Sequence, residues 1–377
     1  MDPSAPRLWW PGRPAEPLCV EASRPSVTER WGEGTPAGTV LLGENLGLLA
    51  GLEPGSVDLA YLDPPFYSGE RYHFRTTAGG RRFEVGAFAD QWPSLGAYLA
   101  FLEDRLRLVA RALSPRGSLY LHLDAQAAHY AKVLADEVLG AAHFSRQIVW
   151  RIGWVSGFKA RAKNWVRNHD VLLYYARPGA PFERILLPHP EGYARRGGGE
   201  GQGRPLDDVW VDLPSIQIMS YSGEKTGYGT QKNLALLERI VRASSRPGDR
   251  VLDPFAGAGT AAVAAHRLGR RFVVIDASPL AVHLTRRRLV AEEAVFTVAE
   301  ETPSTTAPPG PLRVRVVDRA EGPALCLEGA PEAAGPEGTS ELERIDAWWV
   351  YDGEERPARP RFVALRPTGR RGGSVPR

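Results

Sequence analysis

The sequence has few cysteines, few lysines and no long apolar segment, and these shortages exclude several classes of protein. Its two cysteines, Cys19 and Cys326, leave neither a disulfide framework nor a cysteine-rich zinc site. No run of about 18 apolar residues occurs, and the N-terminus lacks an apolar stretch of signal-peptide length. We therefore expect a cytoplasmic protein that has no membrane partner.

The charge balance is mildly basic. The net charge is +3, and only five of the 47 basic residues are lysines, a bias that a GC-rich genome would also produce. This balance is compatible with a polyanionic partner without requiring one. A chain of 377 residues with 43% hydrophobic residues can bury a sizeable core, as one large α/β domain with an appendage or as two domains.

Composition divides the chain into four parts. Residues 1–37 are rich in Pro, Gly and Arg without periodicity, which predicts a partly disordered arm. Residues 38–295 alternate short apolar runs with amphipathic patterns, which predicts a mainly parallel sheet covered by helices. Residues 296–311 resemble a linker, and 312–377 predict a small β-rich appendage and tail.

The spacing of apolar residues along the chain predicts the positions of the strands and helices. The predicted strands are 39–43, 57–63, 118–124, 146–151, 170–176, 246–253, 272–277, 312–317, 324–328, 346–352 and 361–367. The predicted helices are 94–113, 126–140, 234–245, 262–269 and 279–290. Ser94 is the expected N-cap of the longest helix.

The first candidate site is Asp63-Pro64-Pro65-Phe66, directly after a buried strand. Ligands of open α/β sheets bind at the carboxyl ends of strands. The prolines make the loop rigid and donate no hydrogen bond, so the Asp63 carboxylate and the Pro64 carbonyl could accept both hydrogens of an amino group. Phe66 offers a face on which a heterocycle can stack. A Pro-Pro turn that merely ends a strand accounts for the four residues equally well.

The second candidate site is the segment 253–260, Asp-Pro-Phe-Ala-Gly-Ala-Gly-Thr, between a strand and a helix. Gly257 and Gly259 would let a ligand approach the backbone closely. Asp276 ends the next strand, where an acid typically accepts hydrogen bonds from ribose hydroxyls. A nicotinamide dinucleotide is the alternative ligand. Asp253 would repel a pyrophosphate but suits an ammonium group such as that of S-adenosylmethionine.

Both motifs, in this order, resemble the amino-directed DNA methyltransferases of the permuted β group, over about residues 38–293. Gly43-Glu44-Asn45, Gly229-Thr230-Gln231-Lys232 and the segments around 118–124 and 170–176 add to the resemblance. The family usually has Asp where this chain has Glu44, and Pro where it has Asn233. The resemblance implies a Rossmann-like fold with a mainly parallel seven-stranded sheet and a circularly permuted motif order.

The resemblance also implies the site. S-adenosylmethionine would be the cofactor, and the expected cofactor-binding residues are Glu44, Asn45, Thr230, Lys232, Asp253, Pro254, Phe255, Gly257, Gly259, Thr260 and Asp276. The expected catalytic residues are Asp63, Pro64, Pro65 and Phe66. They would direct an extruded adenine N6 toward the methyl group by positioning and electrostatics. A cysteine nucleophile for cytosine-C5 chemistry is missing from both motifs.

Several alternatives stay open. Cytosine-N4 methylation uses the same chemistry, and a noncatalytic nucleic-acid-binding subunit could keep the fold. The resemblance implies double-stranded DNA as partner, in a bacterial, nucleoid-associated setting. It leaves open a restriction endonuclease partner and a homodimer. Four histidines without metal-ligand spacing, His73, His122, His143 and His169, favour core or surface roles, and we expect no metal.

Residues 145–168 contain no acid and interleave basic with aromatic residues. The candidate DNA-binding residues are Arg146, Arg151, Lys159, Arg161, Lys163 and Arg167, among Trp150, Trp154, Phe158 and Trp165. A solvated loop with core tryptophans is the alternative. Residues 177–229 occupy the family's target-recognition position, and their glycine-rich run 195–205 is expected to be mobile without DNA.

Overall fold

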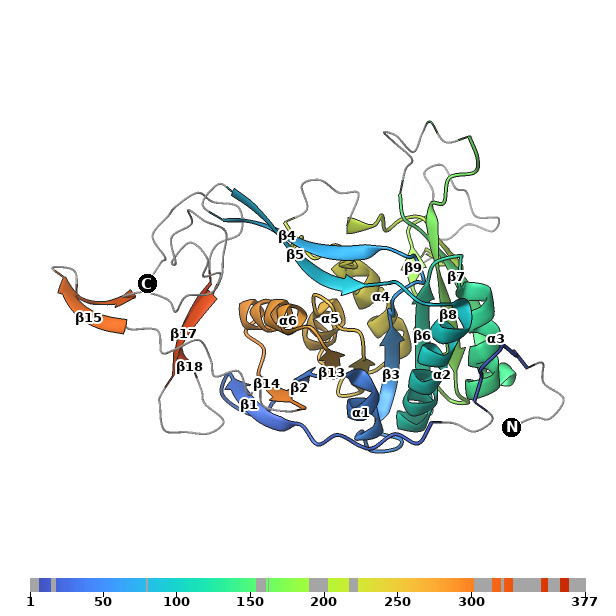
Figure 1. The fold of residues 1–377 in the computed structure, drawn as a ribbon, viewed down its shortest axis with the longest axis horizontal. Coiled ribbons are helices and arrows are strands. Elements are labelled where there is room, and N and C mark those ends of the chain that lie inside the picture. The colour runs from blue at the N-terminus through green and yellow to red at the C-terminus, as the bar shows by residue number, and fades with distance from the viewer. Residues whose placement is uncertain are drawn as a thin grey trace.

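The computed structural model describes most of the first 301 residues and four later strands (Figure 1). The described ranges are 7–14, 18–78, 81–153, 161, 163–189, 203–216, 223–301, 314–319, 322–327, 347–351 and 360–365. For residues 74–78 and 81–87 and for the strands after residue 301 the structure describes the backbone.

One ten-stranded sheet organises the fold, in the order β1-β14-β2-β13-β12-β3-β6-β8-β7-β11. Its strands are β1 (Ser26–Trp31), β2 (Gly38–Leu42), β3 (Val57–Leu62), β6 (Leu113–Leu123), β7 (Phe144–Arg151), β8 (His169–Ala176), β11 (Val209–Trp210), β12 (Arg250–Asp253), β13 (Arg271–Asp276) and β14 (Phe296–Glu300). Strand β8 is antiparallel to both β6 and β7, and β1 is antiparallel to β14, whereas the other neighbours are parallel. The mainly parallel sheet is therefore confirmed.

The sheet is wider than the seven strands that the family resemblance implied. The stretch from β2 to β7 contains seven strands, and β14, β1 and β11 extend it. The predicted boundaries of the N-terminal arm and of the linker also differ from the structure. The expected arm contributes β1, and the expected linker begins with β14, which pairs with β2 from Phe296 to Glu300. Strand β1 has only two apolar residues in six, whereas β14 lies in the mostly apolar segment 294–299, which the prediction assigned to no strand.

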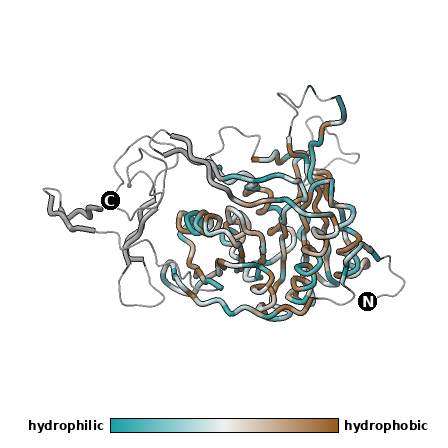
Figure 2. The backbone as a smooth tube through the Cα atoms, viewed as in Figure 1, coloured by the Kyte–Doolittle hydropathy of each residue, from teal (hydrophilic) through white to brown (hydrophobic). Residues whose placement is uncertain are grey.

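Helices cover both faces of the sheet. They are α1 (Asn45–Ala50), α2 (Leu95–Ala112), α3 (Ala128–Leu139), the 3-10 helix η1 (Ala141–His143), α4 (Leu234–Ser244), α5 (Thr260–Arg267) and α6 (Pro279–Ala291). One core cluster packs α4, α5 and α6 on the sheet, and a second packs α1, α2 and α3 on it. Figure 2 shows hydrophobic residues concentrated in the central strands and helices. Ser94 caps α2 as predicted, since its Oγ accepts from the Ala97 N–H at 3.1 Å.

Shorter strands lie outside the large sheet. Two pairs within the first 301 residues are β4 (Arg71–Ala78) with β5 (Arg81–Ala89), and β9 (Leu186–Leu187) with β10 (Arg204–Pro205). Further pairs are β15 (Val314–Arg319) with β16 (Gly322–Leu327), and β17 (Ala347–Tyr351) with β18 (Pro360–Leu365). These last four strands lie where the sequence predicts strands. Among the described helices, none is both long and apolar enough to span a membrane.

Candidate active site

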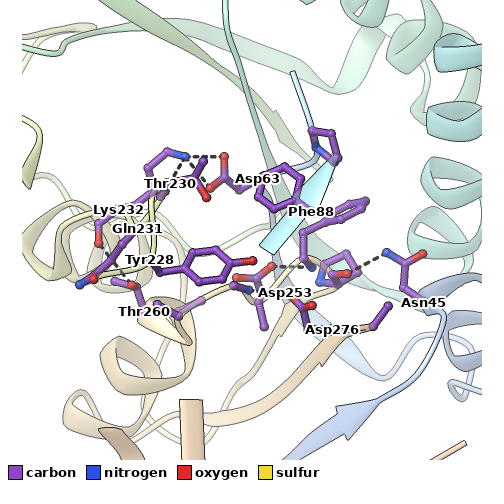
Figure 3. Close-up of a pocket in the computed structure, with 18 of the residues that line it drawn as sticks. Asn45, Asp63, Phe88, Tyr228, Thr230, Gln231, Lys232, Asp253, Thr260 and Asp276 are labelled. Atoms are coloured by element: carbon purple, nitrogen blue, oxygen red, sulfur yellow. Dashed lines mark hydrogen bonds and ion pairs between the residues drawn. The ribbon is translucent and has the colours of Figure 1, made fainter. Parts of the chain in front are cut away.

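The two motifs line one cavity of about 300 Å³ at the carboxyl ends of β3, β12 and β13. Figure 3 shows Asp63 and Lys232 on one side of it, Asp253, Asp276 and Asn45 on the other, and the Tyr228 ring between them. The expected site residues that line the cavity are Glu44, Asn45, Asp63, Pro65, Thr230, Lys232, Asp253, Pro254, Phe255, Gly257, Thr260 and Asp276. Pro64, Phe66 and Gly259 are not among its lining residues.

The order of the strands explains why distant motifs meet. Strands β12 and β3 are direct neighbours, with Val251 opposite Leu59 and Leu252 opposite Ala60. Both run in the same direction, so the loops after Leu62 and Asp253 leave the sheet side by side. The permuted motif order leaves this geometry intact, because sheet neighbours need not be sequence neighbours.

Asp90, which the sequence did not single out, fixes the loop after the two prolines. It is fully buried and its carboxylate accepts from the N–H groups of Phe66, Tyr67 and Ser68 at 3.0, 3.0 and 2.7 Å. It also accepts from the Trp92 indole N–H at 2.8 Å. Three consecutive backbone donors on one carboxylate hold the loop in a single conformation. No sequence motif marks the residue, because the backbone donors that it binds lie 22 to 24 positions away.

Replacing Asp90 by Ala should lower both stability and the turnover number. The change leaves several buried N–H groups without an acceptor, a loss that we expect to cost about 3 kcal/mol. The loop that carries Asp63 would loosen, so kcat should fall at least tenfold while the dissociation constant of the cofactor stays within about threefold. Gln91→Ala, at the exposed neighbouring position, is the control. An unchanged kcat in Asp90→Ala would contradict this role.

The Phe66 ring is half-buried and is not among the residues that line the cavity. Its centroid is 5.7 Å from the ring of His122 and 5.0 Å from the Lys232 ammonium. His122 is fully buried, and its Nδ1 lies 2.8 Å from the Tyr61 hydroxyl, which agrees with the core role expected for it. Besides the expected Phe255, five aromatic residues that the sequence did not indicate line the cavity, namely Tyr61, Phe88, Trp92, Phe101 and Tyr228.

The glycine turn has the backbone conformation that glycine favours. Gly257 has φ +50° and Gly259 has φ +72°. A Cβ at Gly257 would lie 3.2 Å from the Tyr228 ring, and one at Gly259 would lie 2.5 Å from Thr285 Oγ1. Asp276 holds the turn, because its Oδ2 accepts from the Gly257 N–H at 2.8 Å. This carboxylate therefore shapes the turn in addition to facing the cavity.

Burial raises the pKa values of two acids in this cavity. The pKa of Asp276 is raised to about 6 by burial, an effect that the N–H groups of Ser278 and Gly257 partly offset. The pKa of Asp253 is held well above its usual range by burial, although the Phe255 N–H donates to it at 2.9 Å. A cationic ligand would compensate the charge that these acids carry when ionised.

Asn45 and Glu44 are fixed by Arg105, another residue that sequence reasoning missed. The Arg105 Nε donates to Asn45 Oδ1 at 2.7 Å, and its guanidinium also pairs with Glu44. The Asn45 amide donates in turn to the Pro254 carbonyl at 2.8 Å. Helix α1 is thereby joined to the glycine-turn loop.

Lys232, which was expected among the cofactor-binding residues, lines the cavity and lies beside the Asp63 carboxylate. Its Nζ donates to Asp63 Oδ1 at 2.7 Å and to Oδ2 at 2.6 Å. The two side chains are only 11% and 16% exposed, respectively. Its charged end thus binds both oxygens of the Asp63 carboxylate.

The structure separates the basic residues expected to bind DNA. Arg151, Arg161, Lys163 and Arg167 are exposed, between the carboxyl end of β7 and the start of β8. Arg146 lies toward the other end of β7 and lines a second cavity, with Asp208 3.9 Å away, so it is not grouped with them. Lys159, Trp154 and Phe158 lie outside the described residues. Trp150 is a core residue and Trp165 is 98% exposed, so the two tryptophans differ in role.

The segment 177–229 is described in part. Strand β11 joins the large sheet beside β7, and β9 pairs with β10. Most of the glycine-rich run 195–205 lies outside the described residues.

One family model matches the part of the chain that contains both motifs. The profile of the N6/N4 family, described as DNA methylase, matches residues 57–287, which is more than half of the chain and includes both motifs. The chain therefore belongs to this family of DNA methyltransferases.

Individual relatives match over most of their length. The chain is 27% identical over 276 residues to the DNA adenine methyltransferase YhdJ of Escherichia coli strain K12, covering 68% of this chain and 84% of YhdJ. It is 29% identical over 258 residues to the type II methyltransferase M.HpaI of Haemophilus parainfluenzae, covering 67% and 74%. Among solved structures, the cytosine-N4-specific PvuII DNA methyltransferase gives a TM-score of 0.48 at 15% identity, covering 70% of this chain and 90% of that one.

Proposed function

We propose that this methyltransferase transfers a methyl group from S-adenosylmethionine to the exocyclic N6 of adenine in double-stranded DNA, after the base has left the helix. The observation that carries the proposal is that the Asp63 carboxylate and the glycine turn at Gly257 line the same cavity. The name of the relative YhdJ, a DNA adenine methyltransferase, supports adenine as the target.

The residues present suit this cofactor. Gly257 leaves room for a ligand beside Tyr228, Asp276 ends β13 where ribose hydroxyls would bind, and the acids of the cavity suit a cation. S-adenosylmethionine, when bound, supplies an electrophilic methyl group. Glu44, Asn45, Thr230, Asp253 and Thr260 would complete its binding site from the cavity walls.

The chemistry of the base pocket follows from its acceptors. The Asp63 carboxylate and the Pro64 carbonyl would accept the two hydrogens of the adenine amino group. These hydrogen bonds would turn the nitrogen lone pair away from the ring and toward the methyl group, and would stabilise positive charge that develops on the nitrogen. The two prolines and Asp90 hold the loop rigid, and the rigid loop would orient the amino group toward the methyl group.

The test is to express the protein in a strain that lacks DNA methylation and to sequence the DNA for modified bases. N6-methyladenine at a defined site is the expected result, and it also reveals the target sequence. N4-methylcytosine would establish the second candidate function, since Asp63 and Pro64 can bind either amino group. DNA without any modification would count against both activities.

Cofactor binding should weaken as the pH falls through about 6. The pKa of Asp276 is raised to about 6 by burial, so below that pH the carboxylate gains a proton, and one of its two acceptor oxygens becomes a hydroxyl donor that binds ribose hydroxyls less well. We expect the dissociation constant, measured by calorimetry, to rise about tenfold from pH 7 to pH 5. Asp276→Asn should bind more weakly with a flatter pH dependence. Asp253→Asn controls for the other titrating acid, and an unchanged slope in Asp276→Asn would contradict this assignment.

We also propose that Arg151, Arg161, Lys163 and Arg167 contact the DNA backbone and that 177–229 includes the target-recognition segment. The exposed cations lie at the sheet edge that carries Asp63, because β7 runs parallel to β6 and ends at Arg151. Phosphate contacts there would orient the duplex above the base pocket.

A further inference from the structure

Lys232 connects the two halves of the cavity. Its ammonium donates to both oxygens of Asp63, while its backbone carbonyl accepts from the Thr260 hydroxyl at 3.2 Å. Thr260 begins α5 directly after the glycine turn. One residue is thereby bonded to the carboxylate of the base pocket and to the helix that follows the cofactor motif.

The neighbours of Lys232 hold its backbone in place. Gln231 is buried, and its side-chain amide donates to the Glu224 carbonyl at 2.9 Å and accepts from the Thr226 N–H at 2.9 Å. The Asn233 amide donates to the Pro214 carbonyl at 3.0 Å. With the backbone anchored on both sides, movement at Lys232 is confined to its long side chain.

The ammonium occupies the place that the target amine needs. Both Asp63 oxygens already bind Nζ, at 2.7 and 2.6 Å, whereas an adenine amino group is a weaker, uncharged donor. Methyl transfer also develops positive charge on the amine nitrogen, which a neighbouring ammonium would oppose. A weaker partner stands nearby, because the Thr230 carbonyl lies 3.5 Å from Nζ.

We propose that Lys232 is a latch of the base pocket. Without DNA its ammonium pairs with Asp63 and closes the pocket, and it withdraws when the amino group of the flipped base enters. The latch rests on the proposed function, because it presumes a base amine as the incoming group. Lys232 acts through Asp63 and is a positioning residue.

If Lys232 is a latch, two substitutions of this residue should change the KM for DNA in opposite directions. In Lys232→Met the competing cation is absent, so the KM for DNA should fall about fivefold and kcat should rise. In Lys232→Arg a fork of N–H donors matches the carboxylate better, so KM should rise about fivefold and kcat should fall. The substrate is a duplex that contains the methylated site found by modified-base sequencing.

If Lys232 had a purely structural role, the pattern would differ: Lys232→Met would impair catalysis and Lys232→Arg would preserve it. That pattern, or equal KM values in all three proteins, would overturn the latch. Lys232→Gln, also uncharged, should follow Met and serves if the Met variant unfolds; cofactor binding by calorimetry reports whether each variant is folded. Wild-type transfer is measured first, and its absence would count against the proposed function. If the wild-type protein transfers methyl groups normally and the two variants show the structural pattern, the latch is refuted and the proposed function stands.

Discussion

Replacing Asp63 by Asn should lower kcat at least about a thousandfold while the cofactor still binds. The amide has nearly the shape of the carboxylate, but it carries no charge and presents a donor where the base amine needs an acceptor. The glycine turn and Asp276 are untouched by the change, so the dissociation constant of S-adenosylmethionine should stay within about threefold. Methyl transfer to a duplex and calorimetry measure the two effects separately.

The control for Asp63 lies before the strand that Asp63 follows. Glu53→Gln removes an exposed carboxylate just before β3, at the opposite end of the strand from Asp63, and should leave both constants unchanged. Asp63→Ala, which has no donor at all, should be as inactive as Asp63→Asn. If the Asp63 variants lost cofactor binding as well as methyl transfer, Asp63 would not serve the base pocket alone.

Replacing Gly259 by Ala should weaken cofactor binding about a hundredfold and lower the melting temperature. Its φ of +72° disfavours any side chain, and the new Cβ would lie 2.5 Å from Thr285 Oγ1 and 2.8 Å from Thr285 Cβ. Thr285 belongs to the packed helix α6, so the turn itself has to shift. Gly257, whose N–H binds Asp276, would shift with it.

Gly269 provides a matched control for backbone strain. Its φ is +71°, almost the same as that of Gly259, but a Cβ there meets nothing within 4 Å. Gly269→Ala should therefore cost about 1 kcal/mol of stability and leave cofactor binding unchanged. Equal effects of the two substitutions on the dissociation constant would show that the contact with Thr285 is unimportant.

Local sequence signals located most of the central fold. Strands such as β3 and helices such as α2 were predictable because apolar periodicity and the Ser94 cap act over a few neighbouring residues. The missed elements are those stabilised by distant partners. β1 forms because Trp31 pairs with Phe296, and α1 is a helix of only six residues that Asn45 ties to Pro254. Neither contact leaves a trace in the local sequence.

By itself the sequence located the two motifs, since the residues of each stand next to one another in the chain: an acid before two prolines, and a glycine turn between a strand and a helix. Only the tertiary structure decided which side chains serve them. Asp90, Arg105 and the pairing of Lys232 with Asp63 depend on strands and helices that are far apart in the chain. Hydrogen bonds of a few ångströms across such separations are set by packing, which no short stretch of sequence encodes.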